Sequence, residues 1–125
     1  MQENEITGII LDCCIRIHRE LGPGLFESVY EEILAYELEK LGLTVERQRG
    51  VEVEWDGINV GLGFRADLIV DSKVIIELKS VEKLQKVHFK QLQTYLQLTG
   101  IKVGLLINFN EALLKNGFHR VVNGL

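Results

Sequence analysis

Two stretches near the start of the chain repeat apolar residues at intervals of three and four, the period of a helix with one buried face. The first runs from Ile6 to about Leu21, and Gly22 follows it as a left-handed stop signal. The second runs from about Leu25 to Leu41 and ends before Gly42. The pattern therefore predicts two consecutive amphipathic helices.

The middle of the chain changes to the period of two that is typical of β-strands. Residues 44–55 alternate between apolar and polar types, with a bulge or bend expected at Gly50. The Asp-Gly pair at Asp56–Gly57 is a hairpin turn signal. Two more apolar segments, residues 58–70 and 73–80, predict the next two strands.

The last third of the chain predicts one more long helix and one or two strands. The helix is expected from about Val81 to Thr99, with Gly100 ending it. Residues 102–109 form a continuous apolar run, as in a buried strand, and residues 118–122 are a candidate for a short final strand.

This order of elements predicts an α/β fold with helices on both faces of a mixed sheet. The three middle strands are expected to form an antiparallel meander. A helical crossover would then place residues 102–109 parallel to residues 73–80. We expect four strands and three helices in the order α-α-β-β-β-α-β.

Charged residues interrupt the apolar central strands at Asp67, Glu77 and Lys79. Glu77 and Lys79 share one face of their strand because side chains alternate, and they lie about 6.7 Å apart along it. The hairpin loop decides whether Asp67 joins them. A two-residue loop, 71–72, would send Asp67 to the opposite face, whereas a three-residue loop, 71–73, would pair Val70 with Val74.

We favour the three-residue loop, because it places Asp67 across from Glu77 and Arg65 across from Lys79. Adjacent carboxylates repel each other, and a divalent cation would remove that cost. Two carboxylates and a strand carbonyl are hard oxygen ligands suited to Mg²⁺ or Mn²⁺, and Lys79 could stabilise developing negative charge or position a water. A cluster of structural ion pairs at one end of the sheet is the alternative.

The predicted third helix carries a stripe of Leu84, His88, Gln91 and Tyr95, which is typical of a site wall. The alternatives are a buried histidine satisfied within the core and a glutamine that bonds helix to sheet. Three lysines lie along one side of the same segment and either follow a phosphate backbone or form a solvated face: Lys83, Lys86 and Lys90.

Composition narrows the classes of protein. The chain has 125 residues, of which 46% are hydrophobic and 26% charged, as expected for one soluble globular domain over residues 1–125. No apolar run is long enough for a membrane span. The acidic net charge of −4 argues against a protein that coats duplexes. It divides into −8 over residues 1–60 and +4 over residues 61–125, so the second half either offers a local positive surface or has solvated helix faces. Cys13 and Cys14 lack metal-binding spacing and indicate buried thiols in the cytoplasm.

Several of these segments resemble the GxxExxY family of the PD-(D/E)xK nuclease superfamily. The motif that names the family stands here as "GLFESVY", Gly24 to Tyr30. The superfamily core stands as Asp67, nine intervening residues and "ELK", and the helix "QLQTYL" with Gln91 follows. Ala66 stands where the proline of "PD" would be.

The resemblance implies a restriction-endonuclease-like αβββαβ core with an extra N-terminal helix, and a divalent-metal site for cleaving DNA or RNA. Asp67 and Glu77 would bind the metal with the Leu78 carbonyl, and Glu27 would add a carboxylate directly or through water. Lys79 would orient or polarise the attacking water, and Gln91 would position a phosphate or that water. Tyr30, Arg65, His88, Tyr95 and the three lysines are candidate substrate contacts.

Two functions remain open on the sequence. One is a metal-dependent nuclease, and the other is a noncatalytic module that binds nucleic acid or a protein partner. The sequence leaves the oligomeric state open, with a homodimer among the alternatives.

Overall fold

The computed structural model describes all residues, 1–125, and its elements follow the predicted order with one addition. The elements are α1 (Glu3–Leu21), α2 (Glu27–Lys40), β1 (Val45–Trp55), β2 (Ile58–Val70), β3 (Val74–Lys79), α3 (Lys86–Thr99), β4 (Val103–Asn108), a 3₁₀ turn η1 (Leu114–Gly117) and β5 (Phe118–Val122). None of the helices combines the length and apolar character that crossing a membrane requires.

The sheet has five strands in the order β1-β2-β3-β4-β5. The expectation of four strands was therefore wrong, because the candidate strand at residues 118–122 pairs with β4 as β5. All neighbouring pairs are antiparallel except β3 and β4, which are parallel. The meander and the helical crossover expected from the sequence are both present, and the mixed sheet has a restriction-endonuclease-like fold.

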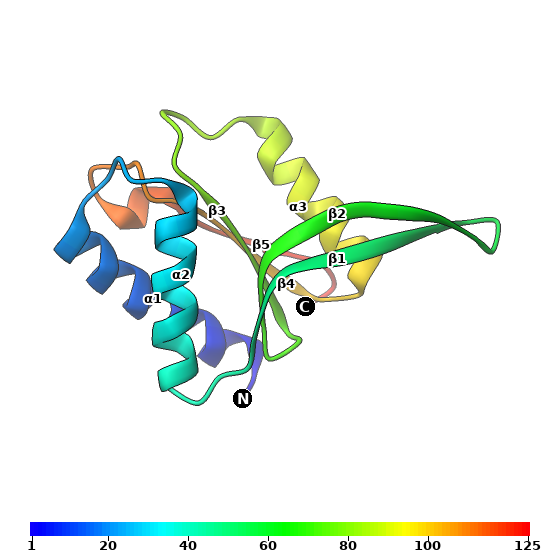
Figure 1. Cartoon of the computed structure of the whole chain (residues 1–125), viewed down its shortest axis with the longest axis horizontal. Helices are drawn as coiled ribbons and strands as arrows, with labels where there is room; N and C mark the ends of the chain where they lie inside the picture. Colours follow the sequence, from blue (N-terminus) through cyan, green and yellow to red (C-terminus); the bar gives the residue numbers. More distant parts are fainter.

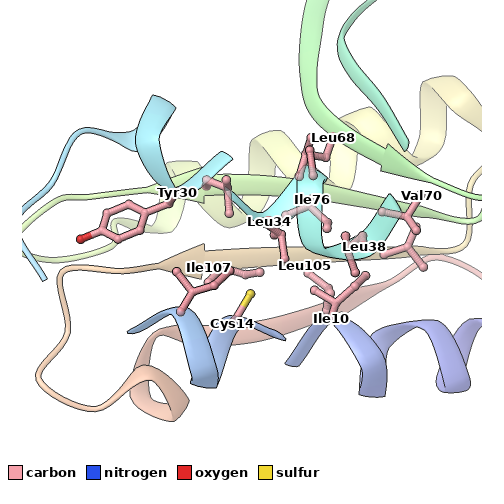
Figure 2. Close-up of a cluster of buried hydrophobic side chains, with 14 of the residues drawn as sticks. Ile10, Cys14, Tyr30, Leu34, Leu38, Leu68, Val70, Ile76, Leu105 and Ile107 are labelled. Atoms are coloured by element: carbon pink, nitrogen blue, oxygen red, sulfur yellow. The ribbon is translucent and has the colours of Figure 1, made fainter. Parts of the chain in front are cut away.

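Two helices cover one face of the sheet and the third covers the other (Figure 1). The larger core, 19 buried residues, joins α1 and α2 to the sheet. Figure 2 shows Ile10 and Cys14 from α1 and Leu34 and Leu38 from α2 gathered around Leu105 and Ile107 of β4. Cys14 is buried as expected, but Cys13 is only half-buried.

The smaller core lies under α3 and explains why a glycine stands in the middle of β4. Leu92 and Leu96 of α3 pack there on Ile75, Ile69, Ala66 and Leu106 of the strands. A β-carbon at Gly104 would lie 2.8 Å from Leu92 Cδ1, so the helix can approach the sheet only where that side chain is absent.

Both hairpin turns match the sequence signals. Trp55 pairs with Ile58 across Asp56–Gly57, and both turn residues have positive φ, 52° and 76°. Val70 pairs with Val74 across the three-residue loop, and the Lys73 amide donates to the Val70 carbonyl at 2.9 Å. This register confirms the three-residue loop.

Helix α3 begins five residues later than predicted, at Lys86 rather than Val81. Gln85 is its N-cap, and the Gln85 amide donates to His88 Nδ1 at 2.9 Å. The preceding segment is held instead by buried Asn108, which accepts from the Val81 amide and donates to the Val81 carbonyl. These bonds keep residues 81–85 out of the helix.

Strands β1 and β2 extend beyond the sheet as a two-stranded arm, residues 51–62 (Figure 1). The expected irregularity at Gly50 occurs just beyond it, as two register shifts between Val51 and Glu54. The arm has several exposed apolar side chains, the largest being Trp55 at 72% exposure. It contributes nothing to either core.

Candidate functional site

Strand β2 separates from β3 at Asp67, and side chains replace the backbone ladder there. The last residues paired in register are Leu68 and Ile76. Beyond them the Asp67 amide donates to Glu77 Oε2 at 3.0 Å, and the Leu78 amide donates to Asp67 Oδ2 at 2.8 Å. The two carboxylates are therefore brought together on adjacent strands.

The alternation of β2 also breaks at Asp67. Leu68 and Val70 point into the core under α1 and α2, but Ala66 belongs to the core under α3, as Ile69 does. On β3 the alternation is regular, so Glu77 and Lys79 share the α3 face with Ile75. The change of face lets the β2 strand leave the sheet while Asp67 stays beside Glu77.

Gln48 marks a matching irregularity on β1. It is the residue that the register places opposite Asp67, and its φ is +49°, rare for a residue with a side chain inside a strand. Its side-chain amide donates to Asp67 Oδ1 at 3.2 Å and to Glu31 Oε1 at 2.7 Å. Gln48 thus links two carboxylates from different elements.

The electrostatics of the pair favour protonation when no cation is bound. Burial raises the pKa of Glu77 to about 8, and the negative charge of Asp67 acts in the same direction. Burial likewise raises the pKa of Asp67, against the bonds from the Leu78 amide and Gln48. The charge of Lys79 lowers the pKa of both carboxyls, so it lies close enough to act on each.

Helix α2 presents two glutamates to this region, one exposed and one buried. Glu27, at the start of the helix, is exposed and accepts a hydrogen bond from the Ser80 amide at 3.1 Å. Glu31, one turn later, is only 7% exposed. Arg47 bonds Glu31 at 3.1 Å, which stabilises the buried charge.

Tyr30 organises the loop before α2 rather than reaching the carboxylates. Its hydroxyl donates to the Gly22 carbonyl at 2.7 Å and accepts from the Leu25 amide at 3.1 Å. Its ring stacks on Phe109 with centroids 4.2 Å apart, and Figure 2 shows the hydroxyl pointing away from the apolar cluster. In this chain the Tyr of "GLFESVY" therefore fixes the segment that carries Glu27.

Helix α3 brings Tyr95 to the site. Its ring stacks on Phe64 at a centroid distance of 3.7 Å, and burial, with the charges of Glu77 and Asp67, raises its pKa. The Nδ1 atom of His88 is engaged in capping the helix. Gln91 is exposed one turn before Tyr95.

The remaining candidate contacts are exposed. They are Arg65, Lys83, Lys86 and Lys90. Arg65 pairs with Gly50 of β1, and the ladder between β2 and β3 does not reach the position expected for it across from Lys79.

Sequence reasoning missed Gln48, Glu31 and Asn108. Asn108 was hidden in the apolar run of β4, although a fully buried asparagine signals a specific hydrogen-bonding role. Gln48 and Glu31 had no local signal, because their importance comes from the meeting of β1, β2 and α2.

The donor set fits a hard divalent cation at Asp67 and Glu77, since both provide carboxylate oxygens in a partly desolvated place. No group of three or more His, Cys, Asp or Glu side chains is arranged to hold a metal ion. Glu27 bonds the Ser80 amide, so only two carboxylates meet. Further ligands would have to be carbonyls, waters or substrate oxygens.

A mixed sheet covered on both faces, with two carboxylates and a lysine where its central strands separate, defines a restriction-endonuclease-like protein. The chain belongs to the PD-(D/E)XK nuclease superfamily, whose family model matches residues 4–121. No curated protein and no solved structure is significantly similar to it.

Proposed function

We propose that the chain is a divalent-metal-dependent nuclease that hydrolyses phosphodiester bonds of DNA or RNA in the cytoplasm, as the resemblance to the GxxExxY family implies. The observation that carries the proposal is the meeting of Asp67 and Glu77 at the strand separation with Lys79 on the same face. The fold has other uses, but two carboxyls with raised pKa values and a nearby amine match this chemistry.

Asp67 and Glu77, with the Leu78 carbonyl, would hold Mg²⁺ or Mn²⁺. The bound cation supplies Lewis-acid activation of the phosphate and a lower pKa for water. Lys79 stabilises negative charge that develops at the phosphate and orients the attacking water. Glu27 contributes through water, because its carboxylate faces the Ser80 amide.

Gln48 and Tyr95 add to the roles assigned from the sequence. Gln48 holds Asp67 in place, and Tyr95, fixed on Phe64, forms the wall of the site on the α3 side. Gln91, one turn before Tyr95, positions the phosphate. Arg65, His88 and the lysines at positions 83, 86 and 90 contact the substrate at its phosphates, which makes binding dependent on salt.

The test is cleavage of labelled single- and double-stranded DNA and RNA with Mg²⁺, Mn²⁺ or a chelator. Wild type should cleave at least one of these substrates with metal and none with the chelator. Lys79→Met keeps the aliphatic stem, so it should fold and bind Mn²⁺ but cleave slower by orders of magnitude, with little change in nucleic-acid affinity. No cleavage by wild type with metal bound would refute the proposal.

A noncatalytic nucleic-acid-binding module is the second candidate. The observation that favours it is the absence of a third carboxylate at the Asp67–Glu77 pair. It predicts the opposite result for Lys79→Met: no metal-dependent cleavage in wild type, and weaker, less salt-sensitive binding in the variant.

A further inference from the structure

A hollow of about 540 Å³ shares Glu27 with the proposed cleavage site, and the charge of Glu27 acts on Asp67. Phe26, Glu27 and Ser28, where α2 begins, form one side, and Ser80 and Asn110 contribute from the segments that follow β3 and β4. Because Ser80 follows Lys79 and its amide bonds Glu27, the hollow begins one residue beyond the proposed catalytic lysine. A nucleotide in it would neighbour the phosphate at Asp67 and Glu77.

Phe26 stands in this wall at a position where its side chain does nothing for the fold. It is 82% exposed, and it is the N-cap of α2 without any side-chain capping bond. That position favours Ser, Thr, Asp or Asn, whose oxygens satisfy a free amide of the first turn. A large apolar ring there neither caps the helix nor joins a core, so its face is open to a ligand in the hollow.

The surroundings of Phe26 match a nucleobase. A flat aromatic ring offers a stacking surface that every base can use, whatever its sequence. Ser28 and Asn110 add a hydroxyl and an amide to the same wall, groups that can hydrogen-bond the edge of a base. Leu25, also in the wall, adds apolar surface.

We propose that this hollow binds an unpaired nucleobase stacked on Phe26, and that the substrate class is therefore single-stranded nucleic acid or an unpaired nucleotide in a duplex. The inference rests on the proposed nuclease function. Bases inside a duplex are already stacked on both sides, so they cannot use Phe26 without being extruded. The net charge of −4 agrees, because binding regular duplex would require an extended positive surface.

The test is a binding titration in chelator, where nothing is cleaved, with a DNA strand containing 2-aminopurine and the blunt duplex of the same sequence. Wild type should bind the single strand more tightly, with the fluorescence quenching that stacking causes. Phe26→Ala should weaken single-strand binding by about tenfold and lose the quenching, whereas Phe26→Trp should keep both. Equal affinities of wild type for strand and duplex, or a Phe26→Ala variant that binds and quenches as wild type does, would overturn the proposal.

The chain offers a matched control on the same helix. Tyr36 is 61% exposed but lies nearly three turns away and does not line the hollow, so Tyr36→Ala should bind like wild type. A loss of affinity as large as that of Phe26→Ala would show that any exposed aromatic ring contributes, and it would overturn the assignment to this hollow.

Phe26→Ser supplies a capping hydroxyl, and it should raise the melting temperature while still losing the quenching. Because this titration contains no metal, it can succeed or fail independently of the cleavage test.

Discussion

Gln48 and Asp67 meet where both strands of the β1–β2 pair lose their regularity. Gln48 has left-handed backbone angles inside β1, Asp67 sits where β2 changes face, and a 3.2 Å hydrogen bond joins their side chains. A residue held in a sparsely populated backbone conformation is often found at a functional site. Here the conformation aims the amide of Gln48 at Asp67 and at Glu31 together.

We expect Gln48→Gly to weaken metal binding more than it weakens the fold. Glycine adopts the positive φ without cost, so the backbone should keep its path. In wild type the hydrogen bond from Gln48 lowers the pKa of Asp67. Removing this bond should raise that pKa and reduce Mn²⁺ affinity at pH 7 by about tenfold. Isothermal titration with Mn²⁺ measures this. Arg49→Ala, at the next position of β1, is the control, and an equal loss there would contradict the role of Gln48.

The raised pKa of Glu77 predicts a loss of stability as the pH rises. The folded protein holds the Glu77 proton up to about pH 8, whereas the unfolded chain releases it near 4.5. Between these two pH values the folded state therefore binds more protons than the unfolded chain. The protonated Glu77 thus contributes stability that is complete below pH 4.5 and is lost as the pH rises through about 8.

Glu77→Gln imitates the protonated side chain, so it isolates this effect. In chelator the variant should match wild type near pH 5 and exceed it at pH 9, by a free energy of unfolding on the order of 3 kcal/mol. Urea denaturation at the two pH values checks the sign. If wild type and variant differ in free energy of unfolding by the same amount at both pH values, Glu77 does not have the raised pKa.

Divalent cations should stabilise the folded protein through the same pair of carboxyls. A cation that binds the folded form only raises the melting temperature with concentration. Mg²⁺ or Mn²⁺ should therefore raise the wild-type melting temperature by several degrees at saturation. Asp67→Asn should abolish the gain, which differential scanning fluorimetry can follow. The same gain in both proteins would place the ion elsewhere.

Tyr30→Phe should destabilise the protein although it keeps the ring. The hydroxyl serves both the Gly22 carbonyl and the Leu25 amide, so the change removes two hydrogen bonds at a buried residue. We expect a loss of about 1–3 kcal/mol in the free energy of unfolding. Tyr36→Phe removes a hydroxyl from an exposed ring of the same helix and should change it by less than about 0.5 kcal/mol. Chemical denaturation of both variants decides whether Tyr30 fixes the loop.

The fold was largely readable from the sequence because its strongest signals are local. The Asp56–Gly57 turn, the Gly100 stop and the apolar runs of β3 and β4 each depend on a few neighbouring residues. The register that brings Asp67 to Glu77 followed from the length of one hairpin loop. The start of α3 was wrong because Gln85 and His88 are an unusual capping pair and because Asn108, distant in sequence, holds the preceding segment.

The site was less readable because it depends on irregular backbone. Strict alternation along β2 cannot give the change of face at Asp67, and helical periodicity alone did not show that Glu31 rather than Glu27 is buried. The partner that allows Glu31 to be buried, Arg47, lies on another element. Such residues are selected by three-dimensional contacts that no short window of sequence contains.

The β1–β2 arm makes the surroundings of the site electrically one-sided. Between Gly50 and Phe64 the arm carries Glu52, Glu54 and Asp56 and no lysine or arginine, whereas α3 carries Lys86 and Lys90 and no acidic residue. Repulsion between unshielded charges acts over about 8 Å at physiological salt. A nucleic-acid backbone that crosses the site would therefore run along the lysines of α3 and avoid the arm. The protein would then protect more nucleotides from chemical probes on one side of the cleaved bond than on the other.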